Sequence, residues 1–352
     1  MTTHLTSPHS DRLHGLDLAR FLAFVGMVIV NFQIVMGAEG GAGLLATLTT
    51  GLEGRAAASF VVLAGIGLGL SARRGSIRST LGLTLRRAVF LMAAGLINML
   101  IFPADILHYY AVYFLFGAFL LPMGTAALMA VIVALNLAAV VLILILDYDA
   151  GWNWQTYGYD GFWTPTGFVR NLFFNGWHPV VPWLGFLVFG IVLSRLTLAD
   201  RRIQVALAGL GALGLIVASG LSRAVSRSVA DSELALLLTT SPIPPMPLYT
   251  LAGMGAASAL TGLCLLLNPT ARGSGLLGWV APAGRQTLTL YIAHIVIGMG
   301  LLEALRLTEN QSTATALFAS LVFCAAAATF AWLWSRRFRR GPVEALMRRL
   351  AG

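Results

Sequence analysis

Three histidines lie within or beside apolar stretches of the chain, namely His108, His178 and His294. An ionisable side chain is costly in such a stretch unless it has a partner or a function. His108 follows Asp105 by three residues, so that on a helix the two side chains share one face. A carboxylate beside an imidazole stabilises the protonated ring and fixes its tautomer, which suits a general base. Asp105 also has the position of a helix N-cap, and the alternative is a capped helix with an interfacial histidine beside Tyr109 and Tyr110.

His178 lies in the segment Asn-Gly-Trp-His-Pro-Val-Val-Pro-Trp, which ends at Trp183. Pro179 and Pro182 suit the first turn of a helix. His178 would then stand near the positive end of the helix dipole, which favours the neutral imidazole. A neutral imidazole can accept a proton, so His178 is a second candidate base, with Trp183 expected to bind donor or substrate.

His294 ends the most polar of the apolar stretches, Gly-Arg-Gln-Thr-Leu-Thr-Leu-Tyr-Ile-Ala-His. It follows Arg285 by nine residues, or about 13 Å along a helix. This depth is close to the middle of a bilayer, where a histidine usually serves a function. Tyr291 lies one turn earlier, and the alternative interpretation is a hydrogen-bonded network between helices.

Charged and amide side chains also flank the first long apolar stretch. Asp17 and Arg20 are three residues apart at its start and can pair on a helix face, as an ion pair at the helix end or as a binding site. Asn31 lies near its far end, where an interhelical hydrogen bond is the simplest role. Asp17 and Arg20 are therefore candidates for binding donor or substrate, and Asn31 is a candidate catalytic residue.

Arg55 precedes a glycine-rich apolar stretch, in Glu-Gly-Arg-Ala-Ala-Ala-Ser-Phe. An arginine that leads into closely packed helices could hold an anion. The alternative is an ion pair with Glu53 or Glu39.

The composition indicates what carries these residues. Of the 352 residues, 58% are hydrophobic and only 11% are charged, whereas a soluble domain has about 25% charged residues. A soluble enzyme is therefore excluded. The net charge of +9 comes from arginines in short connections, since the chain has no lysine, so nucleic acid is not an expected partner. Cys264 and Cys324 lie inside apolar stretches, which argues against a disulfide framework, and no metal is expected.

A spanning helix needs about 20 mostly apolar residues. The predicted fold is an all-α polytopic membrane bundle of about ten helices, because lipid admits no open β-structure. The candidate spans are 16–36, 52–72, 85–103, 107–122, 127–147, 178–195, 203–221, 248–267, 284–304 and 313–335.

The arginines predict the orientation. With the N-terminus in the cytoplasm, 18 arginines fall on the inner side and 5 on the outer side. We therefore predict a multi-pass plasma-membrane protein with both termini cytoplasmic. It would have a tail at 1–15, a membrane domain at 16–335, outer loops at about 147–177 and 222–247, and a basic tail at 336–352. The aromatic-rich first loop is expected to cover the bundle, and the proline-rich residues 241–247 to be extended.

Five segments, taken in order, resemble one family. They are Arg-Leu-His-Gly-Leu-Asp-Leu-Ala-Arg with the following Gly-Met-Val-Ile-Val-Asn, Gly-Arg-Ala-Ala-Ala-Ser-Phe-Val-Val-Leu-Ala-Gly-Ile, Asp-Ile-Leu-His-Tyr-Tyr-Ala-Val, Asn-Gly-Trp-His-Pro-Val-Val-Pro-Trp-Leu-Gly-Phe and Gly-Arg-Gln-Thr-Leu-Thr-Leu-Tyr-Ile-Ala-His. The chain thereby resembles heparan-alpha-glucosaminide N-acetyltransferase and its bacterial YeiB-like relatives, over about residues 12–300.

The resemblance implies acyl transfer from cytoplasmic acyl-CoA, with acetyl-CoA as the expected donor, to an amine or hydroxyl of an extracytoplasmic sugar or lipid-linked acceptor. Asn31 matches the family's first-span asparagine and could bind the oxyanion. The family's catalytic histidine follows that asparagine closely, but residues 32–57 contain no histidine. Another base is then needed, and we rank His108, supported by Asp105, slightly ahead of His178.

The resemblance also suggests where the donor would bind. The CoA phosphates need arginines on the inner side, and those available are Arg20, Arg73, Arg74, Arg86 and Arg87. His294 is expected to position the donor together with Arg285 and Tyr291. The full set expected to bind donor or substrate is Asp17, Arg20, Arg55, Trp183, Arg285, Tyr291 and His294.

Two other functions fit the same features. A transporter or flippase-like carrier of a lipid-linked or small anionic solute would also need polar residues at mid-membrane and glycine-rich spans. A membrane scaffold without catalytic activity is the third possibility. Beyond membrane lipids, acyl-CoA and the acceptor, a second copy of the chain in a homo-oligomer is left open as a partner.

Overall fold

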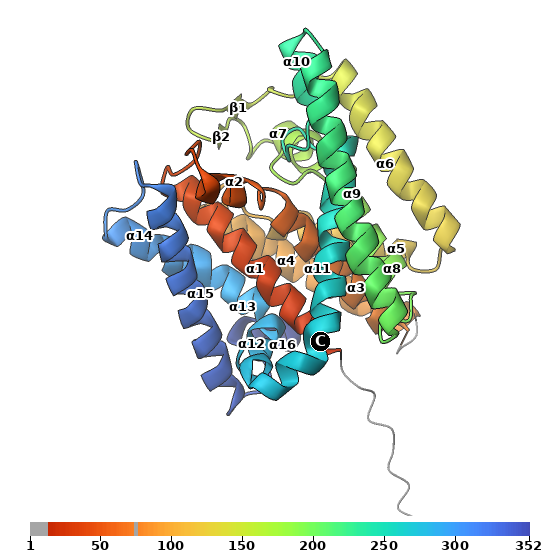
Figure 1. Ribbon diagram of the computed structural model, residues 1–352, viewed down its shortest axis with the longest axis vertical. Helices are drawn as coiled ribbons and strands as arrows, with labels where there is room; N and C mark the ends of the chain where they lie inside the picture. The colour runs from red at the N-terminus through yellow and green to blue at the C-terminus, as the bar shows by residue number, and fades with distance from the viewer. Residues whose placement is uncertain (1–12, 74–76) are drawn as a thin grey trace, which may run out of the picture.

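The computed structural model of the protein describes residues 13–73 and 77–352. Most of the predicted N-terminal tail, and Arg74, lie outside the described residues. The described chain is a bundle of helices whose only sheet is a two-stranded ribbon, β1 (Trp152–Asn153) and β2 (Gly158–Tyr159). The predicted all-α membrane bundle is confirmed (Figure 1).

Every predicted span corresponds to one or more helices. Among the described residues, eight segments are long and apolar enough to cross a membrane. They comprise α1 (His14–Val35), α2 (Leu44–Thr50) with α3 (Arg55–Ala72), α4 (Ile77–Asn98), α6 (Thr125–Ile145), α9 (Arg201–Ser228), α11 (Pro247–Ser274), the run α13 (Thr287–Ala293), η2 (His294–Met299) and α14 (Gly300–Ala304), and α15 (Thr313–Ser335).

The other two predicted spans are irregular. One corresponds to two described segments that meet at a bend of 51°: Pro165–Asn175, which comprises α7 (Pro165–Arg170) and η1 (Asn171–Asn175), and α8 (Val180–Leu193). Counted as one span, this pair makes nine candidate crossings among the described residues. The other corresponds to α5 (Leu107–Leu120), whose 14 residues extend about 21 Å, less than the ~30 Å hydrocarbon core. An irregular or short segment is tolerated at this depth only where protein surrounds it, and α5 packs against α4 and α8.

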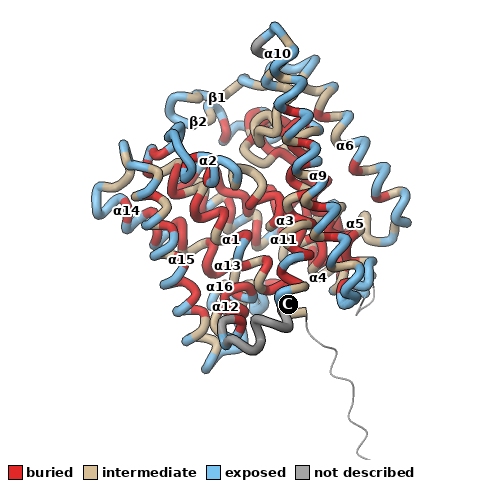
Figure 2. The backbone as a smooth tube through the Cα atoms, viewed as in Figure 1, coloured by how far each residue is buried: buried red, intermediate tan, exposed pale blue. Residues whose placement is uncertain are grey.

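Small residues let the central helices approach closely. A Cβ on Gly65 of α3 would lie 2.1 Å from the Leu187 carbonyl oxygen of α8, and one on Gly190 would lie 2.1 Å from the Val62 carbonyl oxygen. Close packing of this kind holds helices together in lipid, because the hydrophobic effect does not drive helices to associate there. In contrast, α6 and α9 bury few of their residues, as lipid-facing helices do (Figure 2).

The two ends of the bundle differ. The end at which α1 begins, here called the inner end, also carries α12 (Leu276–Arg285) and α16 (Pro342–Ala351). The opposite, outer end carries α2, α10 (Ser232–Leu237) and the segment 146–179 with β1, β2 and α7 (Figure 1). This segment is folded around Asn175, whose Nδ2 donates to the carbonyl oxygens of Tyr148 at 2.7 Å and Ala150 at 2.9 Å.

Three details differ from the predicted layout. Helix α9 continues to Ser228, well into the predicted loop at 222–247, because residues 222–228 contain no proline or glycine to end it. Residues 242–245 form turns and are not extended, since the Ser241 hydroxyl bonds the backbone of Ile243. The predicted basic tail 336–352 contains α16, which packs against α4 and α13.

Candidate functional site

Two cavities enter the bundle from its opposite ends. The inner cavity has a volume of about 290 Å³ and apolar walls, with polar residues toward the inner end: Arg20, Ser71, Thr80, Thr84, Arg87 and Thr287. The outer cavity has a volume of about 210 Å³ and is more polar: Asn31, Glu39, Glu53, Tyr157, Trp177, His178, Trp183 and Ser241 are among its lining residues.

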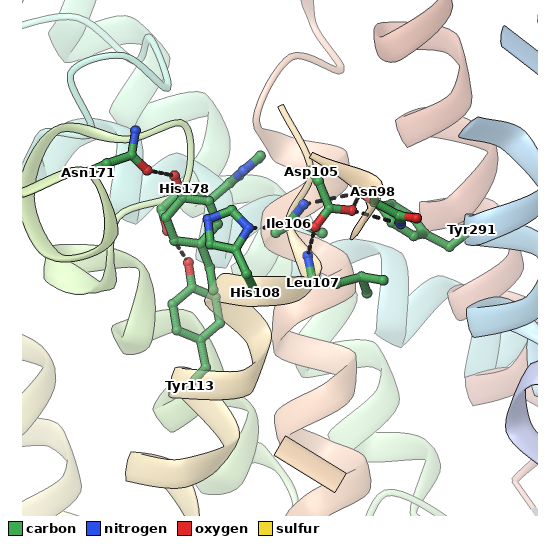
Figure 3. Close-up of polar contacts among 10 residues, drawn as sticks. Asn98, Asp105, Ile106, Leu107, His108, Tyr113, Asn171, His178 and Tyr291 are labelled. Atoms are coloured by element: carbon green, nitrogen blue, oxygen red, sulfur yellow. Dashed lines mark hydrogen bonds and ion pairs between the residues drawn. The ribbon is translucent and has the colours of Figure 1, made fainter. Parts of the chain in front are cut away.

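Tyr291 and Ile106 line both cavities and therefore separate them. The Tyr291 hydroxyl accepts a hydrogen bond from the Ile106 backbone N–H at 3.1 Å and donates to Asp105 Oδ1 at 3.2 Å. Asp105 is fully buried and also accepts from Asn98 Nδ2 at 3.1 Å and from the Leu107 backbone N–H at 2.7 Å (Figure 3). The N-cap of α5 is Ile106, so Asp105 lies one residue before the predicted capping position, although it still bonds the first backbone N–H of the helix. Asp105 also holds the tyrosine that divides the cavities.

His108 does share a face with Asp105, but it lies apart from both cavities. Its Nδ1 is 3.6 Å from Asp105 Oδ2, which is within ion-pair range but too long for a hydrogen bond. The ring is fully buried, packs on Tyr109 at a centroid distance of 3.9 Å, and lines neither cavity. Neither ring nitrogen has a hydrogen-bond partner among the described residues. Because the His108 ring is buried outside both cavities, it is less accessible to a substrate than the sequence suggested.

His178 lies in the break between η1 and α8 and lines the outer cavity. Its backbone carbonyl accepts a hydrogen bond from the Tyr113 hydroxyl, and its ring meets Trp183 edge-on at 4.6 Å. Three nitrogens in this wall have no hydrogen-bond partner within the described chain: His178 Nδ1, Trp177 Nε1 and Trp183 Nε1. Buried polar atoms are normally satisfied, so these are positions at which a ligand or water can bond.

Asn31 and His294 meet across the bundle, although 263 residues separate them in the chain. Asn31 Nδ2 lies 3.0 Å from His294 Nε2, while His294 Nδ1 faces the Tyr291 carbonyl oxygen. Because a carbonyl only accepts, this pattern assigns the proton to Nδ1 and leaves Nε2 to accept from Asn31. His294 also begins the π-helical turn η2, a distortion frequent at functional sites.

Two arginines line the inner cavity. Arg20 makes the predicted ion pair with Asp17 at 2.9 Å, and Arg87 lies on the facing helix α4. Of the other inner arginines that were candidates, Arg73 donates to the Ser194 carbonyl oxygen at 3.0 Å and lies outside this cavity, as Arg86 does.

The remaining predicted arginines lie elsewhere. Arg55 Nη2 donates to the Thr240 hydroxyl at 2.8 Å and so ties the start of α3 to the segment after α10. Arg285 is exposed at the end of α12 and lines neither cavity.

The sequence reasoning missed the acidic wall of the outer cavity, formed by Glu39 and Glu53. The Tyr157 hydroxyl donates to Glu39 Oε2 at 2.8 Å, and this hydrogen bond to a carboxylate is the main reason that the pKa of Tyr157 is raised to about 12. The bond ties the folded outer segment to the loop after α1. Glu39 and Glu53 appeared in the sequence only as partners for Arg55, because no local pattern connects either of them with residue 157.

Comparisons with known families cover nearly the whole chain. Residues 12–223 match the family described as heparan-alpha-glucosaminide N-acetyltransferase, catalytic. Residues 192–352 match a family described as a protein of unknown function (DUF418). A search among curated proteins finds none that matches. The first match contains α1 to α8, which supply most of the residues that line the two cavities. The second match contains Tyr291, His294 and α16.

Proposed function

The chain belongs to the heparan-alpha-glucosaminide N-acetyltransferase-like family of membrane proteins, and from this premise we propose that it moves an acyl group across the bundle. The donor is acyl-CoA, acetyl-CoA in the first instance, which enters the inner cavity. The acceptor is a hydroxyl or amine of an extracytoplasmic sugar or lipid-linked molecule in the outer cavity. The observation that carries this proposal is the pair of cavities that share Tyr291 and Ile106.

In this mechanism the donor's acyl arm lies along the apolar wall of the inner cavity, and its thioester passes Tyr291 and Ile106 to reach the outer cavity, which Asn31 and His178 line. His178 takes the proton from the acceptor as the acceptor's oxygen or nitrogen attacks the thioester carbonyl. The Asn31 amide donates to the oxyanion that forms. The tetrahedral intermediate then collapses, the carbon–sulfur bond breaks, and the imidazolium returns the proton to the CoA thiolate.

Three residues act through others in this scheme. His294 orients the Asn31 amide through the hydrogen bond at 3.0 Å. Asp105 orients the Tyr291 hydroxyl, and Trp183 packs against the His178 ring. We place His178 ahead of His108 as the base because His178 lines the outer cavity and His108 does not.

One observation also favours a carrier. Two cavities that open at opposite ends and are divided by one tyrosine would suit alternating access to a small anionic or lipid-linked solute. The bent pair at His178 resembles the discontinuous helices of transporters. A carrier would move its solute unchanged, whereas the enzyme consumes a thioester.

Binding of the donor tests the proposal. Acetyl-CoA or a longer acyl-CoA should stabilise the detergent-purified protein against heat, by about 2.7 kcal/mol at a concentration 100 times Kd. The measurement is a thermal unfolding curve for each acyl-CoA, followed by detection of free CoA thiol with a sugar acceptor. If no acyl-CoA shifts the unfolding temperature, the protein is a carrier or a scaffold.

The mechanism requires the inner end to face the cytoplasm, where acyl-CoA is made. The 18 arginines predicted for the inner side and the 5 for the outer side agree with that orientation. We expect reporter fusions after residues 10 and 350 to be cytoplasmic and a fusion after residue 160 to be extracytoplasmic. Termini on opposite sides of the plasma membrane would remove one of the ten crossings and contradict this arrangement.

A further inference from the structure

Tyr110 carries a hydroxyl for which the described chain provides no hydrogen bond. The residue lies on α5, is only 4% exposed and lines the inner cavity. Of the described residues that line this cavity, Tyr110 is the one whose buried hydroxyl has no hydrogen-bond partner. Its ring centroid lies 6.1 Å from that of Phe60 and 5.9 Å from that of Phe114, and both phenylalanines also line the cavity. The Tyr110 side chain is therefore surrounded by apolar rings.

A buried hydroxyl without a partner is unfavourable. Leaving such a group unsatisfied costs about 1–3 kcal/mol, and phenylalanine would fill almost the same volume without that cost. The other tyrosine that lines the inner cavity, Tyr291, is different, because its hydroxyl bonds both Ile106 and Asp105. A ligand that enters the inner cavity and carries a hydrogen-bond acceptor would satisfy the Tyr110 hydroxyl.

The position of Tyr110 along α5 selects the part of a ligand that it would meet. Ile106, which lines both cavities, lies one helical turn earlier, and its carbonyl oxygen accepts from the Tyr110 backbone N–H at 3.0 Å. Tyr110 lines the inner cavity and not the outer one. One turn of four residues extends about 6 Å, so Tyr110 lies at about this distance from the partition, on its inner side.

The arm of an acyl-CoA has a carbonyl group at the same spacing. A path of five bonds, through the sulfur, joins the thioester carbonyl carbon to the carbonyl carbon of the first pantetheine amide, and it spans about 6 Å when extended. When the thioester reaches the partition at Ile106 and Tyr291, the first amide is therefore at the level of Tyr110. An amide carbonyl in an apolar cavity needs a hydrogen-bond donor, because its burial without one is costly.

We propose that the Tyr110 hydroxyl donates a hydrogen bond to the first amide carbonyl of the donor's pantetheine arm, and thereby sets the depth at which the thioester meets the outer cavity. The inference rests on the proposed function, because it takes acyl-CoA as the donor. Tyr110 is in this scheme a donor-binding residue that takes no part in the transfer itself. The ester carbonyl of a membrane phospholipid offers the same acceptor chemistry, and the test separates the two sources.

The test compares Tyr110→Phe with the wild type, both full-length and detergent-purified, by titration calorimetry with CoA and with acetyl-CoA. The variant should bind both ligands about 10-fold more weakly, a loss of about 1.4 kcal/mol. CoA keeps the amide but has no thioester, so an equal loss for the two ligands identifies the amide. An acetyl-CoA analogue with a methylene group in place of that amide carbonyl should bind the wild type and Tyr110→Phe equally.

Tyr148→Phe is the matched control. Tyr148 also has a buried hydroxyl without a partner among the described residues, but it lies at the outer end of the bundle and lines neither cavity. This variant should bind CoA as the wild type does. Without ligand, Tyr110→Phe should unfold at a temperature at least as high as the wild type, because the change removes an unsatisfied hydroxyl. A clearly lower unfolding temperature would show that the hydroxyl is bonded within the fold, and would contradict the inference.

The outcomes separate this inference from the proposed function. Wild-type protein that binds neither CoA nor acetyl-CoA would overturn the proposed function and this inference with it. Wild-type protein that binds CoA, with Tyr110→Phe equally tight, would overturn the inference alone. A loss for acetyl-CoA but none for CoA would assign the hydroxyl to the thioester carbonyl, which overturns its assignment to the amide. If Tyr110→Phe keeps its CoA affinity but loses the stabilisation that phospholipid nanodiscs give the wild type, the acceptor is a lipid ester, which also overturns the inference.

Discussion

Replacement of His178 by alanine is expected to lower the rate of acyl transfer by about 10²–10⁴-fold, the usual cost of losing a general base. The physical reason is that His178 lines the outer cavity and its Nδ1 has no partner among the described residues, so a ring nitrogen is available to the acceptor. The measurement is the release of CoA thiol by the purified variant at saturating acyl-CoA and acceptor. Its thermal unfolding should resemble that of the wild type.

His108→Asn is the contrasting variant. Because the His108 ring is fully buried and lines neither cavity, its loss should lower stability while leaving the activity of the folded fraction within a few-fold of the wild type. The opposite pattern, with full activity in His178→Ala and a large loss in folded His108→Asn, would assign the base to His108 with Asp105 as its partner. Full activity in both would exclude a histidine base at either position.

Replacement of Gly67 by phenylalanine is expected to abolish donor binding. Gly67 lines the inner cavity, and a Cβ there would meet only Arg20 Nη2, at 3.5 Å, within 4 Å. A benzyl group can therefore enter the space that we propose for the acyl arm without displacing backbone. We expect the affinity for acyl-CoA to fall at least about 100-fold, which corresponds to about 2.8 kcal/mol, and transfer to stop.

A second glycine, on α4, provides the control for this variant. Gly82→Phe on α4 adds the same ring at a position with nothing within 4 Å of the new Cβ and outside both cavities, so it should bind the donor normally. Gly65 is unsuitable, because its Cβ would lie 2.1 Å from the Leu187 carbonyl oxygen and any side chain would separate α3 from α8. Wild-type acyl-CoA affinity in folded Gly67→Phe would show that the donor does not use the inner cavity.

Local patterns predicted the elements of this protein well, because hydropathy over about 20 residues and single-turn spacing are properties of short segments. The apolar runs correspond to the helices, Asp17 pairs with Arg20, and Asp105 bonds the first backbone N–H of α5. The family resemblance drawn from five short segments was confirmed by the family matches. Each of these features depends on residues close together in the chain.

The pairing of Asn31 with His294 was beyond such reasoning, since it joins helices 263 residues apart. The same holds for the choice between His178 and His108. Helix α5 is apolar almost all round, so its sequence does not mark which face meets a cavity, and the rotation that buries His108 comes from packing against α4 and α8. The break that brings His178 into the outer cavity is likewise a bend between two packed segments.

Short segments of sequence thus establish that the protein is an α-helical membrane bundle, which polar residues lie in its apolar stretches, and which family it resembles. The position of Tyr291 between two cavities and the docking of the C-terminal helix through Glu344 follow from the tertiary fold alone. The physical reason is that burial in lipid depends on local composition, whereas a cavity depends on how several helices rotate and pack against one another.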